Sequence, residues 1–154
     1  MKIKLSNSPL YTIVDDEDYT RVKGYTWFAR ISESSCAIRG WVIDHHMNLS
    51  NFIMNDETKM YDHEDLDPLN NQKINLRESS HSQNMMNRRK FKNCSSRYKG
   101  VTWHRVRNSW YAQIAINGKR KSLGYFTIEE NAAKAYNKAA KEFHGEFARL
   151  NVIN

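Results

Sequence analysis

Cysteine, proline, glycine and long apolar runs are all scarce in this chain of 154 residues. Its two cysteines, Cys36 and Cys94, lie far apart without forming a CxxC pair, which excludes a disulfide scaffold and favours a reducing compartment. Six glycines and two prolines exclude a collagen-like chain. No apolar stretch approaches the ~18 residues that a membrane-spanning helix needs, and none follows the basic residues at the start. We therefore expect an intracellular protein without a secretory signal.

Acidic residues are absent between Arg88 and Gly124, a stretch that holds eleven basic residues. The chain has a net charge of +7, but residues 1–87 carry −4 and residues 88–154 carry +11. This asymmetry predicts two functional halves, the second attracted to a polyanion; the alternative is a solvated basic surface. The basic residues fall mostly in strand-like segments rather than on an amphipathic helix, so we expect no membrane partner.

The N-terminal half has mixed strand, loop and helix signals. Alternating aromatic and β-branched residues predict two strands within residues 25–43, joined by a serine-rich turn over residues 32–35. The acidic run at residues 15–18 predicts a short turn, and residues 62–75, dense in Asp and Asn, predict a loop. Ser79 or Ser80 can then cap a helix that runs towards Arg88.

The C-terminal half predicts strands at residues 98–104, 109–116 and 119–125. Asn117 and Gly118 favour a type I′ hairpin turn, because both tolerate a positive φ. Thr127 and Glu130 form a capping box for an alanine-rich helix that stops at Gly145. One face of this helix collects Ala132, Tyr136, Ala140 and Phe143. We therefore predict an α+β fold that ends in a three-stranded antiparallel sheet packed on one helix.

Five sequence blocks in the basic half carry a family resemblance. They are Tyr-Lys-Gly-Val at 98–101, Trp-Tyr-Ala-Gln-Ile at 110–114, Leu-Gly-Tyr-Phe at 123–126, Ala-Ala-Lys-Ala-Tyr at 132–136 and His-Gly-Glu-Phe-Ala-Arg-Leu-Asn at 144–151. Over residues 95–151 the chain resembles the APETALA2/ethylene-response-factor DNA-binding domain. The resemblance implies a three-stranded sheet, backed by a helix, that reads the major groove of double-stranded DNA.

Carried over position by position, this resemblance gives a set of DNA-facing candidates. They are Lys99, Thr102, His104, Gln113, Ala115, Arg120 and Ser122. Arg105 and Arg107, which follow the first of these strands, are added as DNA-binding candidates for their charge. Several positions lack the Arg and Trp of the plant members, so the plant target sequence does not transfer. Among the candidates, Arg120 and Gln113 suit guanine and adenine edges.

A second group of polar residues lies in the acidic half. Hydrolysis of a phosphodiester needs a base that activates water and a cation that neutralises charge at the phosphate. His63 can be the base, and the oxygens of Asp62 and Asn84 suit a hard cation such as Mg²⁺, or Mn²⁺ in its place. On spacing alone, an Asx-rich turn with a chance histidine is an equal alternative.

The wider pattern favours the chemical interpretation. It runs Asp-His-x-Asp-x-x-x-Leu-x-Asn-x-x-x-Asn-Leu-Arg over residues 62–77, followed by Ser-His-Ser-Gln-Asn-x-x-Asn over residues 80–87. Over roughly residues 10–88 the chain resembles the HNH nucleases of phage and intron homing endonucleases, which have a ββα-metal fold. The resemblance implies that His63 is the general base, that Asp62 and Asn84 bind the metal, and that Asn75 holds the loop.

Two departures from the nuclease pattern, at Ser50-Asn51 and at Glu64, and one alternative function accompany these resemblances. Ser50 and Asn51 replace a His-Arg pair that usually precedes the motif, and the absence of paired CxxC motifs excludes the zinc-bound subclass.

We predict a nuclease domain at residues 1–89, a linker at 90–96 and an APETALA2-like domain at 97–154. The favoured function is a site-specific, metal-dependent DNA endonuclease; the alternative is a weak or inactive DNA-binding regulator. We expect a monomer or a DNA-bound dimer in the cytoplasm of a bacterium or phage-infected host.

Overall fold

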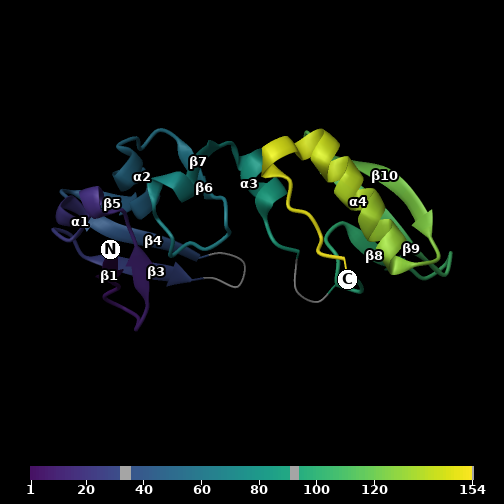
Figure 1. Cartoon of the computed structure of the whole chain (residues 1–154), viewed down its shortest axis with the longest axis horizontal. Helices are drawn as coiled ribbons and strands as arrows, with labels where there is room; N and C mark the ends of the chain where they lie inside the picture. Colours follow the sequence, from purple (N-terminus) through teal and green to yellow (C-terminus); the bar gives the residue numbers. More distant parts are fainter. Residues whose placement is uncertain (32–35, 91–93, 154) are drawn as a thin grey trace. The chain divides into compact units, whose positions relative to one another are not determined.

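The computed structural model describes residues 1–31, 36–90 and 94–153 (Figure 1). Helices mix with short sheets along the chain, an arrangement that is compatible with the predicted α+β class. Two compact units divide the chain, Met1–His81 and Ser82–Asn154; the functional domain boundaries remain a prediction. The serine-rich turn predicted at residues 32–35 and the linker residues 91–93 lie outside the described residues. Within the described part of the chain, no helix is long and apolar enough to cross a membrane.

The first unit is built from short antiparallel sheets and two short helices. Its elements are β1 (Lys2–Lys4), β2 (Tyr11–Ile13), α1 (Asp16–Val22), β3 (Trp27–Ile31), β4 (Cys36–Val42), β5 (His45–Asn48), α2 (Leu49–Met54), β6 (Met60–His63), η1 (Lys73–Asn75) and β7 (Leu76–Ser79). β1 pairs with β2, β4 lies between β3 and β5, and β6 pairs with β7. Helix α3 (His81–Asn87) follows directly after Ser80, where the sequence predicts it.

Trp27 is central to the core of this unit. Its side chain is 1% exposed and lies edge-on to Phe52 with ring centroids 5.4 Å apart. A buried indole N–H needs an acceptor, and that of Trp27 donates to the carbonyl oxygen of Val22 at 2.8 Å. The aromatic run that predicts a strand here therefore also closes the space between β3, α1 and α2.

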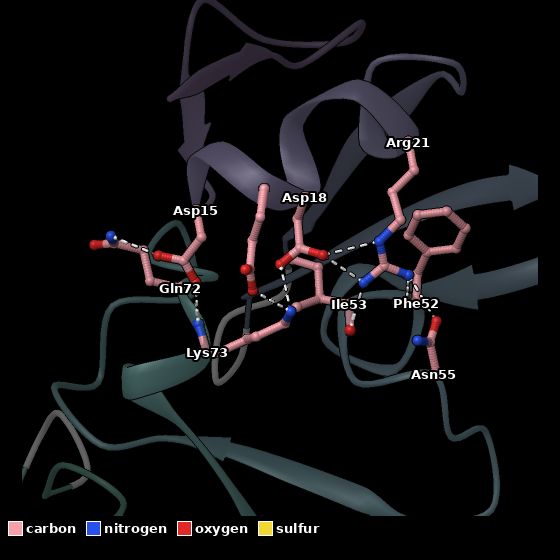
Figure 2. A network of polar contacts seen from close by, with 9 residues as sticks. Asp15, Asp18, Arg21, Phe52, Ile53, Asn55, Gln72 and Lys73 are labelled. Carbon is pink, nitrogen blue, oxygen red and sulfur yellow. Dashed lines mark hydrogen bonds and ion pairs between the residues drawn. The ribbon is translucent and has the colours of Figure 1, made fainter.

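The acidic run at residues 15–18 begins helix α1 and is not the short turn predicted from the sequence. Three acidic residues in the first turn suit the positive end of the helix dipole. Asp18 is 3% exposed, and its Oδ1 accepts from Arg21 Nε at 2.8 Å and from Nη2 at 2.6 Å. Arg21 also donates to the carbonyl oxygens of Phe52 and Ile53 at the end of α2 (Figure 2). The pair thus joins α1 to α2.

The second unit contains a three-stranded antiparallel sheet and a long helix. Its elements after α3 are β8 (Val101–His104), β9 (Ser109–Ile116), β10 (Lys119–Phe126), α4 (Glu129–His144) and η2 (Gly145–Phe147), and the strand order is β10-β9-β8. Ile114 of β9 packs with Tyr136 and Ala140 of α4 in one buried cluster. Small alanine side chains on α4 allow the helix to approach the sheet closely, and Ala132, Ala133 and Ala140 have no exposed surface.

Local signals in this unit have mixed outcomes. Asn117 and Gly118 have φ values of 50° and 76°, which confirms the hairpin turn, and α4 ends before Gly145 as predicted. The capping box is wrong: Ile128 holds the N-cap position without a side-chain hydrogen bond. Glu130 instead accepts from Arg97 Nη2 at 2.6 Å, so a tertiary ion pair takes the carboxylate that the local motif would use.

Candidate active site and nucleic-acid interface

Asp62 and His63 are the last two residues of strand β6. The sequence placed them in a loop, and this prediction is wrong. In the β6–β7 register Asp62 lies opposite Arg77, and His63 lies opposite Leu76. Neighbouring residues on a strand project to opposite faces, so the carboxylate and the imidazole point away from each other in the hairpin. Asp62 is 4% exposed, whereas His63 is partly exposed.

The loop between β6 and η1 is fastened to strand β2. The N–H of Ile13 donates to the carbonyl oxygen of Leu69 at 2.7 Å, and the N–H of Asn71 donates to the carbonyl oxygen of Ile13 at 2.8 Å. The hydroxyl of Thr12 donates to the same Leu69 carbonyl at 2.9 Å. These hydrogen bonds between β2 and the loop hold the backbone of the loop in one conformation.

The start of α1 anchors the far end of the same loop. Asp15 accepts from Gln72 Nε2 at 3.0 Å and from the backbone N–H of Lys73 at 2.8 Å (Figure 2). The Lys73 ammonium group lies 2.5 Å from Glu17 and 3.2 Å from Asp18, and these carboxylates raise the pKa of Lys73. The acidic run of the sequence therefore anchors the loop that leads from His63 to Asn75.

The buried side chain of Asn75 makes hydrogen bonds to two residues of this loop, Asp65 and Asn70. Its Nδ2 donates to Asp65 Oδ1 at 3.0 Å and to the carbonyl oxygen of Asn70 at 2.7 Å, and its Oδ1 accepts from the N–H of Asp65 at 3.1 Å. Desolvation alone would raise the pKa of Asp65, but hydrogen bonds from the Asp67 N–H, Asn70 and Asn75 bring it below its ordinary value. A charged Asp65 is thus part of the loop structure.

His63 and Asn71 are joined by a hydrogen bond whose direction can be assigned. Nε2 of His63 lies 3.1 Å from Oδ1 of Asn71. The amide nitrogen of Asn71 donates to Thr12 Oγ1 at 3.0 Å and to the carbonyl oxygen of Pro68 at 2.9 Å. A backbone carbonyl can only accept, so the amide oxygen faces the imidazole and Nε2 must carry the hydrogen. The neutral ring therefore has its basic lone pair on Nδ1.

Asp62 is charge-paired with the opposite strand. Arg77 donates to its Oδ2 from Nε at 3.2 Å and from Nη2 at 3.0 Å. Asn84, the other predicted metal ligand, lies on α3 beyond the boundary of the first unit. Within the described residues no three His, Cys, Asp or Glu side chains form a group that could hold a metal ion.

The donor chemistry of these two residues fits Mg²⁺ rather than zinc. Mg²⁺ prefers hard oxygen ligands and is commonly bound through one or two carboxylates together with waters and substrate phosphates. Asp62 provides a carboxylate that is held in one orientation by Arg77, and Asn84 provides an amide oxygen.

Ser50 and Asn51, which stand in place of the expected His-Arg pair, are buried in α2. Each is 8% exposed. The Asn51 amide nitrogen donates to the carbonyl oxygens of Asp56 and Lys59, both at 2.8 Å, and so fixes the segment that leads into β6. Asn51 therefore has a structural use that explains its presence.

Six of the DNA-facing candidates share one face of the second unit's sheet. Opposite residues in an antiparallel pair share a face, and the register places Ser122 opposite Gln113 and Arg120 opposite Ala115. Ala112 and Ile114, which alternate with these positions on β9, are buried against α4. By the same alternation from buried Val101, Thr102 and His104 of β8 are on the outer face. The structure therefore brings together Thr102, His104, Gln113, Ala115, Arg120 and Ser122.

Two aromatic residues that are not among the predicted DNA-facing candidates, Tyr111 and Tyr125, also lie on this face. They lie opposite each other in the β9–β10 register with ring centroids 4.8 Å apart, and His104 meets Tyr125 edge-on at 5.2 Å. Arg107, a candidate from the β8–β9 turn, places its guanidinium 4.5 Å from the Tyr125 ring centroid. The period-two pattern from Gln113 could have identified Tyr111, whereas Tyr125 follows an irregularity between Ser122 and Gly124.

Two further basic candidates, like Arg107, lie outside the strands. Arg105 is exposed in the β8–β9 turn. Lys99 precedes β8, and its ammonium group donates to the carbonyl oxygens of Met86 and Arg88 at and just beyond the end of α3. Burial, with Arg149 and Arg88 nearby, lowers the pKa of Lys99 to about 8. Lys99 is thus engaged within its own unit, unlike the residues on the sheet.

Comparison with known proteins gives relatives of two kinds. A stretch of 93 residues is 39% identical to an uncharacterised HNH endonuclease of Acanthamoeba polyphaga mimivirus, covering 60% of this chain and 47% of that protein. A stretch of 59 residues is 41% identical to an AP2-like ethylene-responsive transcription factor of Arabidopsis thaliana, covering 38% of this chain and 12% of that factor. The names of these relatives confirm the predicted combination of HNH and APETALA2 resemblances.

A third relative determines the family. A stretch of 89 residues is 33% identical to protein 3.8 of Escherichia phage T7 and covers 58% of this chain and 73% of that protein. The chain belongs to the protein 3.8 family. As a member of that family, it spans about half the length of the mimivirus relative and a small part of the plant factor. No family model and no solved structure matches it.

Proposed function

We propose that this protein is a site-specific DNA endonuclease that hydrolyses a phosphodiester with one divalent metal ion and His63 as general base. A relative named HNH endonuclease and relatives named as AP2-like transcription factors support a nuclease that binds DNA. The observation that carries the proposal is the bond between His63 Nε2 and Asn71 Oδ1, which fixes the ring in one tautomer. A phage relative supports action in a phage-infected host cell.

In this proposal Nδ1 of His63 accepts the proton of the attacking water. Neutral imidazole is suited to this role, because a histidine side chain can accept and release a proton near neutral pH. When the ring becomes positively charged, Nε2 still donates to Asn71 Oδ1, so the charged form keeps its partner. Asn71 is therefore a positioning residue, and Asn75 acts one step further away by holding the loop against Asp65.

Asp62 and Asn84 are the residues that would hold Mg²⁺, or Mn²⁺ in its place. The bound ion would supply the positive charge that neutralises the developing charge at the scissile phosphate. Arg77 keeps the Asp62 carboxylate in one orientation by donating twice to Oδ2. One site in one chain cuts one strand per encounter, so the protein nicks as a monomer or cuts both strands as a DNA-bound dimer.

The sheet of the second unit provides the DNA-binding surface. Its outer face presents Arg120 and Gln113, which can form paired hydrogen bonds to guanine and adenine edges. The backbone N–H of Arg107 donates to Nδ1 of His104 at 3.2 Å, so the neutral His104 ring has its donor at Nε2. Basic residues around the sheet would contribute contacts to phosphates and affinity that falls with salt.

Cleavage of supercoiled phage or host DNA tests the nuclease. Wild-type protein should give relaxed or linear product with Mg²⁺ and none with EDTA. His63→Ala should reduce the rate about 10²- to 10⁴-fold, the usual contribution of a general base. His45→Ala is the matched control, because His45 is an exposed histidine of the same unit with its own partners, Asp44 and Glu57. Equal activity of His63→Ala and His45→Ala, or cutting in EDTA, would contradict the proposal.

The second candidate is a DNA-binding regulator with little or no nuclease activity. Its supporting observation is Asn51, whose amide is committed to the Asp56 and Lys59 carbonyls at a position where the nucleases have a His-Arg pair. Salt-sensitive, site-selective DNA binding without cleavage would favour this candidate. DNA that contains the selected binding site must be used, because a strict site-specific enzyme leaves other DNA uncut.

A further inference from the structure

A basic pocket of about 370 Å³ lies within the second unit, apart from the strands of its sheet. Its lining includes Arg89, Lys90, Arg97, Lys99, Arg149 and Asn151. Five of these are cations, and no carboxylate occurs among the described residues that line the pocket. A concave surface with charges of one sign concentrates the field and favours a counter-ion.

The frame of the pocket is held by paired side-chain amides. Asn151 Oδ1 accepts from the N–H of Lys99 at 2.7 Å, and its Nδ2 donates to the Lys99 carbonyl oxygen at 3.0 Å. The backbone of Asn151 makes a second reciprocal pair with the side chain of Asn137, at 2.7 and 2.8 Å. The segment after η2 is therefore fixed beside the start of β8, and the pocket is a built feature.

Lys99 also lines this pocket with its side chain held by backbone acceptors. Lys99 is partly buried, and its ammonium group donates to the carbonyl oxygens of Met86 and Arg88, which uses two of its three N–H groups. Arg149 and Arg88 lie close enough to oppose its charge. Like charges gathered in a partly buried place destabilise the protein unless an anion joins them.

Not all of the lining cations are equally available. Arg97 is 2.6 Å from Glu130, which offsets its charge. Arg149 is exposed, and within the described part of the chain no ion pair joins it or Arg89 to a carboxylate. Arg149, Arg89 and Lys99 thus supply positive charge that the protein itself does not neutralise by ion pairing.

We propose that this pocket binds a phosphate group of the DNA backbone. The inference rests on the proposed DNA-binding function and extends it, because the sheet face reads base edges whereas this pocket would hold the sugar-phosphate chain. A phosphodiester carries one negative charge and acceptor oxygens that match the guanidinium group of Arg149 and the remaining N–H of Lys99. Contact with a phosphate carries no sequence information and fixes the position of the protein on the duplex.

The salt dependence of DNA affinity tests the pocket. Arg149→Gln in the full chain should lower the slope of log affinity against log salt by about 0.9, the value for one phosphate contact, with the same loss on every sequence. Lys134→Gln is the matched control, because Lys134 is an exposed cation on α4 outside the pocket. Lys99→Met should behave as Arg149→Gln does. Equal slopes for Arg149→Gln, Lys134→Gln and wild type would overturn the proposal.

A titration followed by nitrogen NMR separates the sources of phosphate. A short duplex should shift the Arg149 Nε–H signal at concentrations where inorganic phosphate has no effect. A shift with inorganic phosphate alone, and none with duplex, would overturn the assignment to DNA. If wild-type protein binds no DNA at all, the proposed function itself fails, whereas binding that is insensitive to Arg149→Gln removes only the pocket.

Discussion

Asn71 holds its side-chain oxygen 3.1 Å from Nε2 of His63, and its amide nitrogen is already bonded to Thr12 and Pro68. Asn71 is 1% exposed, so neither the amide orientation nor the histidine tautomer can change without loss of buried hydrogen bonds. This relationship joins β2, the loop and β6 at one ring nitrogen. It determines which ring nitrogen of the neutral His63 carries the hydrogen.

Replacement of Asn71 should therefore lower activity without removing the base. We expect Asn71→Ala to reduce the cleavage rate about 10- to 100-fold, an effect common for residues that orient a site ligand. The nitrogen NMR spectrum of His63 should change from one dominant Nε2–H tautomer to a mixture. Gln72→Ala, on the same loop but bonded to Asp15, should leave the tautomer unchanged. An unaltered His63 spectrum in Asn71→Ala would contradict this assignment.

The Asp18–Arg21 pair should be important for the stability of the first unit. Arg21→Met removes five hydrogen bonds and leaves the buried Asp18 carboxylate with Lys73. We expect a loss of about 2 to 4 kcal/mol in the free energy of unfolding, measured by urea denaturation. Lys73→Met removes the ion pairs of a more exposed ammonium group with Glu17 and Asp18 and should cost less than Arg21→Met. Equal losses for the two variants would contradict the ranking.

Gly100 should not tolerate a side chain. A Cβ at this position would lie 2.1 Å from Cδ2 of Tyr136, and the backbone φ is +75°. We expect Gly100→Ala to destabilise the second unit by about 3 kcal/mol or more, from overpacking and backbone strain together. Gly118→Ala has a similar φ of +76° but nothing within 4 Å, so it should lose only ~1 kcal/mol. Thermal denaturation of both variants measures the difference.

Lys99 should give the second unit a stability that rises with pH above neutrality. Its pKa in the folded protein is about 8, below the ordinary lysine value of 10.5. Between these two values the unfolded chain binds more protons than the folded one, so the free energy of unfolding rises as pH increases from about 8 to 10.5. Urea denaturation across this range should show the rise in wild type and not in Lys99→Met. Parallel curves for the two proteins would contradict it.

Arg120 and Lys121 form a matched pair for testing the sheet face. Arg120 lies opposite Ala115 on the outer face, whereas Lys121 lies opposite Ile114 and places its ammonium group 4.5 Å from the Phe143 ring centroid. Arg120→Gln should weaken binding to the selected DNA site by about 1 to 3 kcal/mol and relax its specificity. Lys121→Gln should cause a smaller loss that is the same on all sequences. Similar loss of specificity in both would contradict the assignment of faces.

Several local features follow from the sequence because short-range physics decides them. The Asn117–Gly118 turn needs a positive φ at both residues, and the end of α4 needs a residue that can leave the helix at Gly145. The predicted capping box at Thr127 failed because Glu130 has a stronger partner in Arg97. Residues 15–18 form the N-cap and first turn of α1. There Asp15 accepts from the backbone N–H of Lys73, and Asp18 is paired with the Lys73 ammonium group, contacts that the local sequence does not specify.

The candidate site likewise has features that the sequence predicts and features that only folding brings together. The pattern around His63 named Asp62, Asn75 and Asn84, and the bonds of Asn75 within the loop are local ones that its spacing can anticipate. No signal in the sequence assigns a role to Thr12, which lies 59 residues from Asn71 and orients its amide. Nor does the sequence place the Lys99 ammonium group against the carbonyls of Met86 and Arg88.

The sequence by itself determined the α+β class, the family resemblances and the charge division between the two halves, because these depend on residue type and on spacing along the chain. Tertiary structure decided which nitrogen of His63 is basic, which face of the sheet gathers Gln113 and Arg120, and which cations surround a pocket with Lys99. These outcomes depend on hydrogen bonds and like charges brought together by folding, and their strength is set by burial, which residue order alone does not specify.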